Sequence, residues 1–181
     1  TAWLLDASGK VPIGEGHPLH DIRANPSGPS HPDVFYLCSS AESAVFAGQA
    51  GVGMMFAEFI ARTDGGPAVE AYRAAFRPSA LRAEPWAGVA TIAYAADTSG
   101  GAWREDAPRR AASVSMLTGQ RQRFLSIEAA EAFLADFASS PVLADVERRT
   151  IAGDPTEVAA QLAGKAETSG ADEVFVMATG P

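Results

Sequence analysis

The chain has 181 residues, 47% of them hydrophobic and 20% charged, a composition that suits one globular domain with a substantial core. Fourteen basic against 22 acidic side chains give a net charge of −8, which argues against binding to nucleic-acid backbones or anionic membrane surfaces. Cys38 is the single cysteine, so no internal disulfide can form, and no apolar run reaches the roughly 18 residues of a membrane span. We therefore expect a cytoplasmic protein.

The chain then alternates between strand and helix patterns. Residues 1–32 read as a Pro/Gly-rich connector, and residues 98–125 as a Gly- and Arg-rich excursion that is helical in part at most. The predicted strands are 33–38, 52–60, 86–97 and 171–179, and the predicted helices are 43–50, 68–79, 126–138 and 153–170. Because the strands are apolar on both faces and separated by helices, the pattern predicts an α/β fold with a parallel sheet.

Three serines crowd the point where the first predicted strand gives way to a helix. In parallel α/β sheets, ligands collect at the carboxyl ends of the strands, where a helix N-terminus offers unpaired N–H groups. Ser39, Ser40 and Ser43 could add hydroxyl donors there and hold a phosphate. The alternative is that one serine caps the helix while the others satisfy backbone groups of the loop.

Four stretches carry a resemblance to a known family. They are "DVFYLCSSAESAVFAGQAGVGMMFAEFI" (33–60), "YRAAFRPS" (72–79), "AYAADT" (93–98) and "GDPTEVAAQLAGKAETSGADEVFVMAT" (153–179). In order and spacing they resemble the bacterial-luciferase-like flavin-dependent monooxygenases, over about residues 30–179. The resemblance implies a parallel-stranded (β/α) TIM-barrel fold that binds reduced flavin mononucleotide (FMN) and uses O2, with a deazaflavin cofactor as the alternative.

The same resemblance assigns site residues. Ser39 and Ser40 would offer backbone N–H groups to the flavin phosphate, and the hydroxyls of Ser40 and Ser43 would reach its oxygens. Ala57 and Glu58, at the tip of the next strand, would face the flavin ring system. Luciferases carry a bulky aromatic residue near the second of these positions, so Glu58 argues against light emission and becomes the candidate catalytic residue.

A complete (β/α)8 barrel needs roughly 250 residues, and the match implies its second half only. Residues 1–181 then form a single partial barrel domain, made of the connector (1–32), strand-helix units (33–97), an excursion resembling the family's active-site loop (98–125), and closing helices with a last strand (126–181). A fragment, one chain of a split barrel and a half-barrel completed by a second copy all stay open. Unpaired strand edges are expected near 33–38 and 171–177, which predicts a homo-oligomer or a partner chain that completes the barrel.

Other side chains have less specific patterns. His17, His20 and Asp21, with His31 further on, make a metal site conceivable, but ligand spacing in a Pro/Gly-rich loop is weakly specific, so no metal is predicted. Cys38 is predicted to be a packing residue, and Glu58 could form an ion pair with Arg62 one helical turn away instead of acting on substrate. The arginines of the excursion could close over an anion, although a solvated surface is the simpler prediction; they are Arg104, Arg109, Arg110, Arg121 and Arg123.

Two functions follow from these expectations. The first is a luciferase-like monooxygenase, or the C-terminal portion of one, that uses reduced FMN and O2 on a small organic substrate with the help of a flavin reductase. The second is a flavin-binding or assembly half-barrel without turnover of its own.

Overall fold

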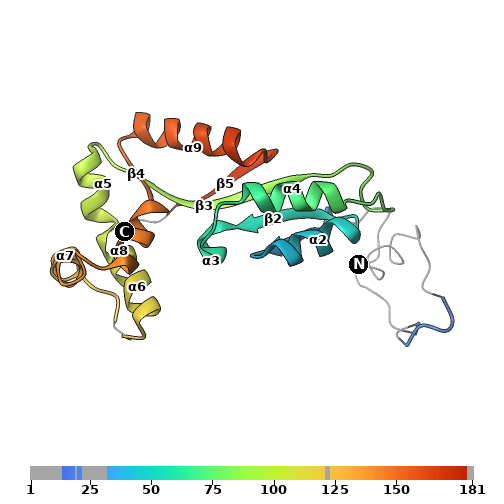
Figure 1. Ribbon diagram of the computed structural model, residues 1–181, viewed down its shortest axis with the longest axis horizontal. Helices are drawn as coiled ribbons and strands as arrows, with labels where there is room; N and C mark the ends of the chain where they lie inside the picture. Colours follow the sequence, from blue (N-terminus) through green and yellow to red (C-terminus); the bar gives the residue numbers. More distant parts are fainter. Residues whose placement is uncertain (1–13, 19, 22–31, 121–122, 179–181) are drawn as a thin grey trace. The chain divides into compact units, whose positions relative to one another are not determined.

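The computed structural model describes residues 14–18, 20–21, 32–120 and 123–178, so most of the predicted connector lies outside the described residues. The strands are β1 (Phe35–Cys38), β2 (Gly53–Ala57), β3 (Ala87–Ala95), β4 (Ile151–Gly153) and β5 (Glu173–Ala178) (Figure 1). The helices are α2 (Ala41–Gln49), α3 (Glu58–Ala61), α4 (Gly66–Ala75), α5 (Ser99–Glu105), α6 (Ala107–Thr118), α7 (Ile127–Ala135), α8 (Pro141–Arg148) and α9 (Pro155–Ser169). None of these helices is long and apolar enough to cross a membrane.

The strands are hydrogen-bonded in the order β1-β2-β3-β4, and β5 pairs with β3. β1 and β2 run parallel, with Cys38 opposite Phe56, and β3 and β4 run parallel, with Ala93 opposite Ile151. Parallel strands joined by helices confirm the predicted α/β class of TIM-barrel type. The chain divides into two compact units: the first contains residues up to 57, 63–89 and 169–173, and the second contains 58–62, 90–168 and those from 174 on.

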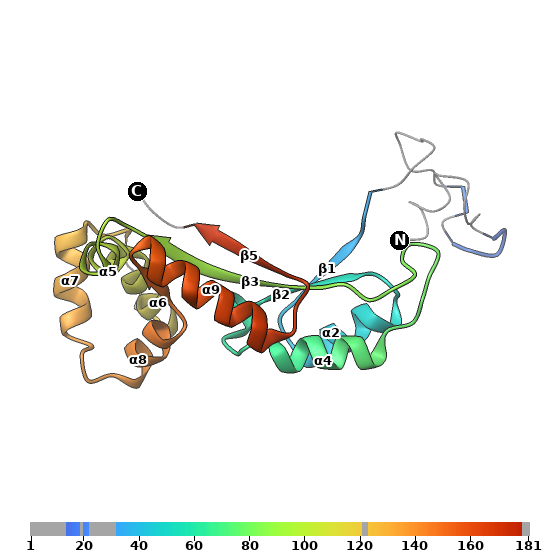
Figure 2. The ribbon, with the colours of Figure 1, turned by 90° about the horizontal axis from the view of Figure 1, so that it is seen from above.

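In the first unit, α2 and α4 lie side by side along the β1–β2 pair (Figure 2). Gly48 of α2 allows this close approach, because a Cβ atom built at this position would lie 2.6 Å from the carbonyl oxygen of Tyr72 on α4. The Tyr72 ring is fully buried, and its hydroxyl donates to the Val52 carbonyl (2.8 Å) and accepts from the Trp86 N–H (3.0 Å). The Tyr72 side chain therefore links α4 by hydrogen bonds to the residues directly before β2 and β3.

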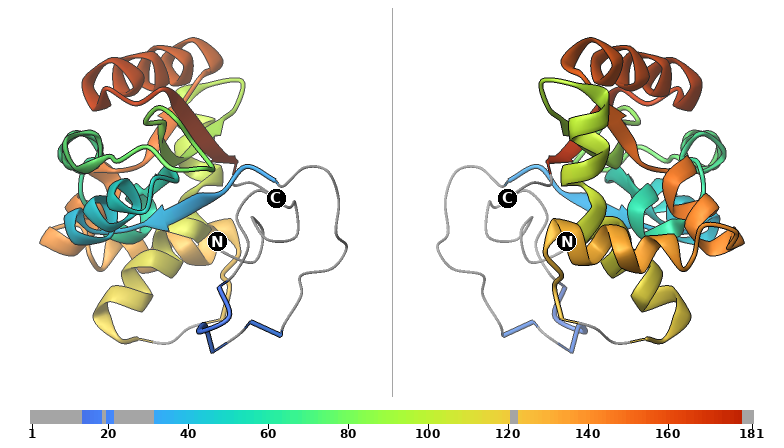
Figure 3. Two further views of the ribbon diagram at one scale, coloured as in Figure 1. Left: turned by 90° about the vertical axis from the view of Figure 1, so that its right-hand side faces the viewer. Right: turned by 90° about the vertical axis from the view of Figure 1, so that its left-hand side faces the viewer.

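In the second unit, α6 packs against α7 and α8 around a small apolar core (Figure 3). Asp106 has a buried side chain and receives two hydrogen bonds from Arg109, at 2.7 and 2.6 Å. Arg110 stacks over Trp103 and bonds Glu147 at 2.8 Å. A solvated surface was therefore the wrong prediction for these two arginines, because buried carboxylate and aromatic partners hold them.

The excursion at 98–125 is more helical than predicted. Thr98 caps α5 by accepting from the Gly101 N–H at 3.1 Å, and Pro108 occupies the first turn of α6. Gly100 and Gly101 weaken the helix signal at α5, yet α5 forms and packs against β4, α6 and α7.

Three further elements differ from the sequence expectations. The predicted strand 52–60 ends at Ala57, because the next four residues form α3, whose turn is closed by a 2.9 Å bond from the Arg62 N–H to the Glu58 carbonyl. The pattern did not reveal α8 and β4. β4 is three residues long, too short for a periodicity to show, and it brings the number of described strands to five instead of four.

The sheet has open edges in the part of the chain that the structure describes. β1 stands at one end of the strand order, and Leu37 on it is 64% exposed. On β5, Phe175, Val176 and Met177 are consecutive and each is between 42% and 45% exposed. Since successive strand residues point to opposite faces, both faces of β5 leave apolar surface uncovered. Open edges are as predicted for 33–38 and 171–177.

Candidate phosphate site at the serine turn

The serine turn, residues Ser39–Ser43, lies at the carboxyl end of β1 and begins α2. Ser40 has an extended backbone, and its Oγ accepts from the Ser43 N–H at 3.2 Å. Ser43 reciprocates, because its Oγ accepts from the Ser40 N–H at 3.1 Å. This reciprocal pair is a capping box, so the structure shows the capping role that the sequence left as an alternative.

The N–H groups predicted to hold a phosphate already have an acceptor within the turn. Ser39 donates its N–H to Ser43 Oγ at 3.3 Å, and the Ser43 hydroxyl donates to the Ser40 carbonyl at 2.9 Å. Ser40 is exposed and Ser43 is half-buried, so neither hydroxyl is enclosed by hydrocarbon. A phosphate at this turn would share or replace Ser43 Oγ as acceptor. The Ser40 hydroxyl donates to Ser43 Oγ at 3.3 Å and would have to turn from it to reach the phosphate.

The electrostatics of the turn favour negative charge. Glu42 stands in the first turn of α2, and hydrogen bonds from its own N–H and from the Ser40 side chain hold the pKa of its carboxyl below the ordinary value. A carboxylate at this place is thus stabilised by the same donors that would meet a phosphate. The orphan N–H groups and the dipole at a helix N-terminus give the physical reason.

The N-terminus of α9 offers a contrast. Asp154 Oδ1 accepts from the N–H groups of Thr156 (2.8 Å) and Glu157 (2.9 Å), and Glu157 Oε2 accepts from the Asp154 N–H at 3.1 Å. Glu157 also lies over Gly153 and accepts a hydrogen bond from Ser99. Two carboxylates therefore occupy this N-terminus and would repel a phosphate, whereas the N-terminus of α2 has two serine hydroxyls and one carboxylate, that of Glu42.

Ala57 lies beside the serine turn. It follows Phe56, which pairs with Cys38 in the parallel register, so the ends of β1 and β2 bring Ala57 and Ser39 to the same edge. Ala57 is fully buried. Cys38 is 1% exposed, and burial raises the pKa of its thiol, offset in part by a hydrogen bond with Ser43, which agrees with the predicted packing role.

Glu58 does not pair with Arg62. Its buried carboxylate lies 2.7 Å from Nζ of Lys165 on α9, and Arg62 instead bonds Asp145 on α8 at 3.0 Å. The one-turn spacing suggested the wrong partner, because Arg62 stands just beyond α3 with a left-handed backbone, φ = +62°. Glu58 is therefore a fixed, buried anion.

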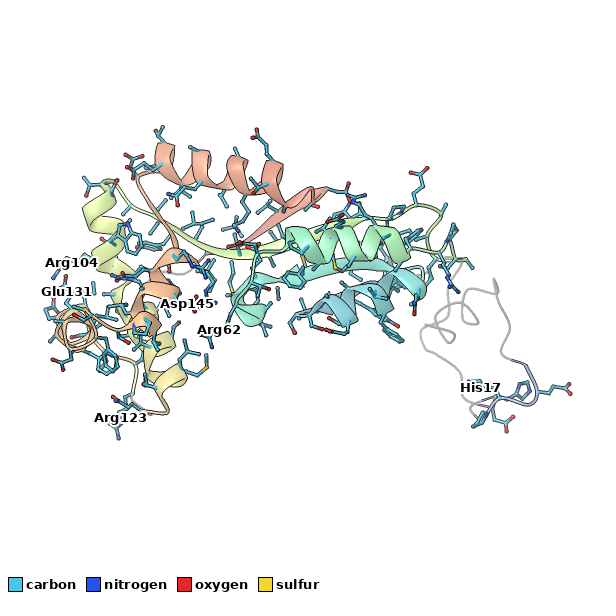
Figure 4. The ribbon with its side chains drawn as sticks, viewed as in Figure 1. His17, Arg62, Arg104, Arg123, Glu131 and Asp145 are labelled. Atoms are coloured by element: carbon cyan, nitrogen blue, oxygen red, sulfur yellow. The ribbon has the colours of Figure 1, made fainter. Side chains whose placement is uncertain are left out.

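The remaining predicted candidates have separate environments. Arg104 lies near two carboxylates, Glu128 at 3.0 Å and Glu131 at 3.5 Å, and Arg123 borders a pocket of about 550 Å³ beside α6 (Figure 4). His17, His20 and Asp21 belong to no cluster of three metal-ligating side chains within the described ranges. His31 and Arg121 lie outside the described residues.

Two polar groupings were missed by sequence reasoning. Tyr94 near the end of β3 donates to Glu105, which raises the pKa of the phenol. Asp145 lies within ion-pair distance of three arginines: Arg148 in α8, Arg149 directly after it, and Arg62 directly after α3. The Asp145 grouping had a partial sequence signal, since Arg148 and Arg149 follow Asp145 at the helical spacings of three and four residues. The Asp154–Glu157 pair had the capping-box spacing.

Solved structures share this fold. The chain matches apo-MsnO8 with a TM-score of 0.76 and 26% identity, over 97% of this chain and 52% of MsnO8. It matches the oxygenating constituent of 3,6-diketocamphane monooxygenase from Pseudomonas putida, solved in complex with FMN, with a TM-score of 0.51 and 19% identity over 93% of this chain and 48% of that one. It matches an F420-dependent secondary alcohol dehydrogenase with a TM-score of 0.53 and 10% identity, over 92% and 49%.

No protein-family model matches the chain. Among curated relatives, Bacillus subtilis YvbT is 31% identical over 173 residues, which cover 89% of this chain and 48% of YvbT. YwcH of the same organism is 42% identical over 82 residues, 45% of this chain and 25% of YwcH. The chain thus spans about half the length of YvbT and of the matching solved structures.

Proposed function

We propose that this chain is the C-terminal portion of a flavin-dependent, luciferase-like monooxygenase, and that its serine turn holds the phosphate of FMN. The observation that carries the proposal is the turn itself: an exposed, hydroxyl-lined helix N-terminus at the carboxyl end of a parallel strand, where a carboxylate is already stabilised. The N-terminus of α9 is the less suitable phosphate site, because two carboxylates occupy it, whereas Glu42 is the single carboxylate in the first turn of α2.

The described residues fit the cofactor in chemistry. The Ser40 hydroxyl and the first-turn N–H groups of α2 would bind phosphate oxygens, and the apolar end of β2 at Ala57 would support the ring system. When bound, the reduced flavin would provide the chemistry that uses O2. Glu58 next to Ala57 is the candidate residue for handling a proton on a small organic substrate, with Lys165 fixing its position.

The comparisons support a flavin-type cofactor without choosing its kind. One matching structure is a monooxygenase constituent in complex with FMN, and another is F420-dependent. We propose FMN for this chain, with the deazaflavin as the alternative. A flavin reductase would supply the reduced cofactor.

The runner-up function is a flavin-binding or assembly module without turnover. The open edges of β1 and β5 favour it, because strands of another copy or another chain could pair there. Oxygen consumption separates the two functions. The assay contains the chain, NADH, FMN and a flavin reductase. O2 uptake above that of the reductase alone, together with substrate turnover, supports the monooxygenase. Flavin binding without added uptake supports the module.

Cofactor binding is tested by flavin fluorescence titration of the purified chain. The double variant Ser40→Ala/Ser43→Ala should weaken FMN binding by about 1 to 3 kcal/mol, because charge-assisted hydrogen bonds are lost. Ser126→Ala is the matched control, since Ser126 caps α7 in the same way, accepting from the Ala129 N–H at 3.3 Å. Unchanged FMN affinity in the double variant, or an equal loss in the control, would reject the serine turn as the phosphate site.

A further inference from the structure

Three arginines share one carboxylate in the second unit. Nη2 of Arg62 lies 3.0 Å from Asp145 Oδ2 (Figure 4). Nη2 of Arg148 lies 2.8 Å from Asp145 Oδ1. Arg149 bonds the same carboxylate and also donates from Nε to the Asp145 carbonyl at 3.1 Å. We call Arg62, Asp145, Arg148 and Arg149 the arginine cluster.

The cluster carries a surplus of positive charge. Three guanidinium groups against one carboxylate give a formal charge of +2, in a chain whose net charge is −8. The other acidic residue of α8, Glu147, is held by Arg110 at 2.8 Å. Arg104 shows the opposite balance, with two glutamates around one guanidinium.

The guanidinium groups also keep unused donors. Each guanidinium has five N–H bonds, yet Arg62 and Arg148 each contact Asp145 through Nη2 alone. Their side chains are 46% and 61% exposed, so the remaining donors face solvent. An incoming anion can therefore be bound without breaking a bond to Asp145.

The backbone of Arg62 adds an independent observation. Its φ of +62° is the left-handed conformation that glycine usually adopts after a helix and that is unfavourable for a residue with a Cβ atom. The chain places a long cationic side chain there, and that side chain joins the cluster. Such a strained residue is a reason to look for a function of its side chain.

We propose that the arginine cluster binds the phosphate group of a small molecule, as a second anion site apart from the serine turn. A phosphate dianion balances the +2 charge, and its oxygens match the planar fork of arginine, whereas a single carboxylate would leave a surplus. The group can come from free phosphate or from a phosphate monoester. The proposal goes beyond the proposed cofactor role and does not depend on it.

The test is calorimetric titration of the purified chain with inorganic phosphate and, separately, with glycerol 3-phosphate, at constant ionic strength set with NaCl. Arg62→Gly removes one guanidinium and relaxes the backbone, and Arg148→Ala removes an exposed one. Each should weaken phosphate binding about 10-fold, because a charge-assisted contact is lost. Equal affinity for the two ligands would mean that the phosphate group alone is recognised. Tighter binding of glycerol 3-phosphate would mean that the site prefers a phosphate monoester. Both outcomes support the site.

All titrations use the Ser40→Ala/Ser43→Ala background, so that phosphate bound at the serine turn does not contribute. Arg104→Ala in that background is the control and should not change the phosphate affinity. Acetate at the same concentration should bind at least 10-fold more weakly, since it carries a single charge. Absence of phosphate binding, or binding that survives both Arg62→Gly and Arg148→Ala, would overturn the proposal. Unchanged FMN affinity in Ser40→Ala/Ser43→Ala would reject the serine turn and leave the cluster proposal standing, so the failures of the two proposals are distinguishable.

Discussion

The ion pair between Glu58 and Lys165 is largely enclosed, with side chains 8% and 20% exposed. We predict that Lys165→Met destabilises the chain by about 2 kcal/mol, because a buried carboxylate loses its counter-charge. Urea denaturation gives the free energy of unfolding that checks this value. The exposed pair of Arg104 and Glu128 is the comparison, and Arg104→Ala should change stability by less than about 1 kcal/mol.

The double variant Glu58→Gln/Lys165→Met should recover part of that loss, since neither charge then stays buried alone. If Lys165→Met is no more destabilising than Arg104→Ala, Glu58 is solvated and its role as a fixed anion is wrong. Retained stability with lost turnover in Glu58→Gln would instead favour a chemical role for Glu58.

At the scale of elements, the contact between α2 and α4 depends on a glycine. We predict that Gly48→Ala destabilises the chain by about 2 kcal/mol, although alanine is the better helix former, because the added Cβ atom would meet the Tyr72 carbonyl and the helices must separate. Thermal and urea denaturation measure the change.

Gly164→Ala in α9 is the matched control. A Cβ atom built there meets no atom within 4 Å, so this variant should be stabilised by about 0.5 to 1 kcal/mol. The two substitutions are thus expected to have opposite signs. A stabilising Gly48→Ala would mean that the α2–α4 packing is looser than the structure shows.

Elements with strong local signals were predictable from the sequence. The predicted helix at 153–170 corresponds to α9, and the predicted strand at 33–38 contains β1. The start of α9 was predictable because Asp154 followed by Pro155 is a typical helix start. The helices of the excursion and β4 were not predictable from the sequence. Gly100 and Gly101 weaken the helix signal of the excursion, and a strand of three residues is too short to show the alternation of a β-strand. The serine turn could be predicted as a helix start. The arginine cluster could not be predicted as a whole, because Arg62 and Asp145 are 83 residues apart.

For the whole molecule, uncovered apolar surface on β1 and β5 predicts association. Edge strands with exposed apolar side chains pair readily with other strands, and Leu37 is 64% exposed. We expect the purified chain to self-associate in analytical ultracentrifugation, and Leu37→Lys or Val176→Lys to shift it toward monomer. Ala112→Lys on α6 is an exposed control away from the strands. A monomeric chain at all concentrations would contradict the prediction.

The buried position of Cys38 has a practical consequence. It is the single thiol of the sequence, it lies beneath the serine turn, and only 1% of its surface is accessible. A thiol-specific label added to the native protein therefore finds its target only when the corner between β1 and α2 opens. The labelling rate of Cys38 therefore reports how often the β1–α2 connection opens. Comparing the rates with and without FMN would show whether the cofactor reduces that opening.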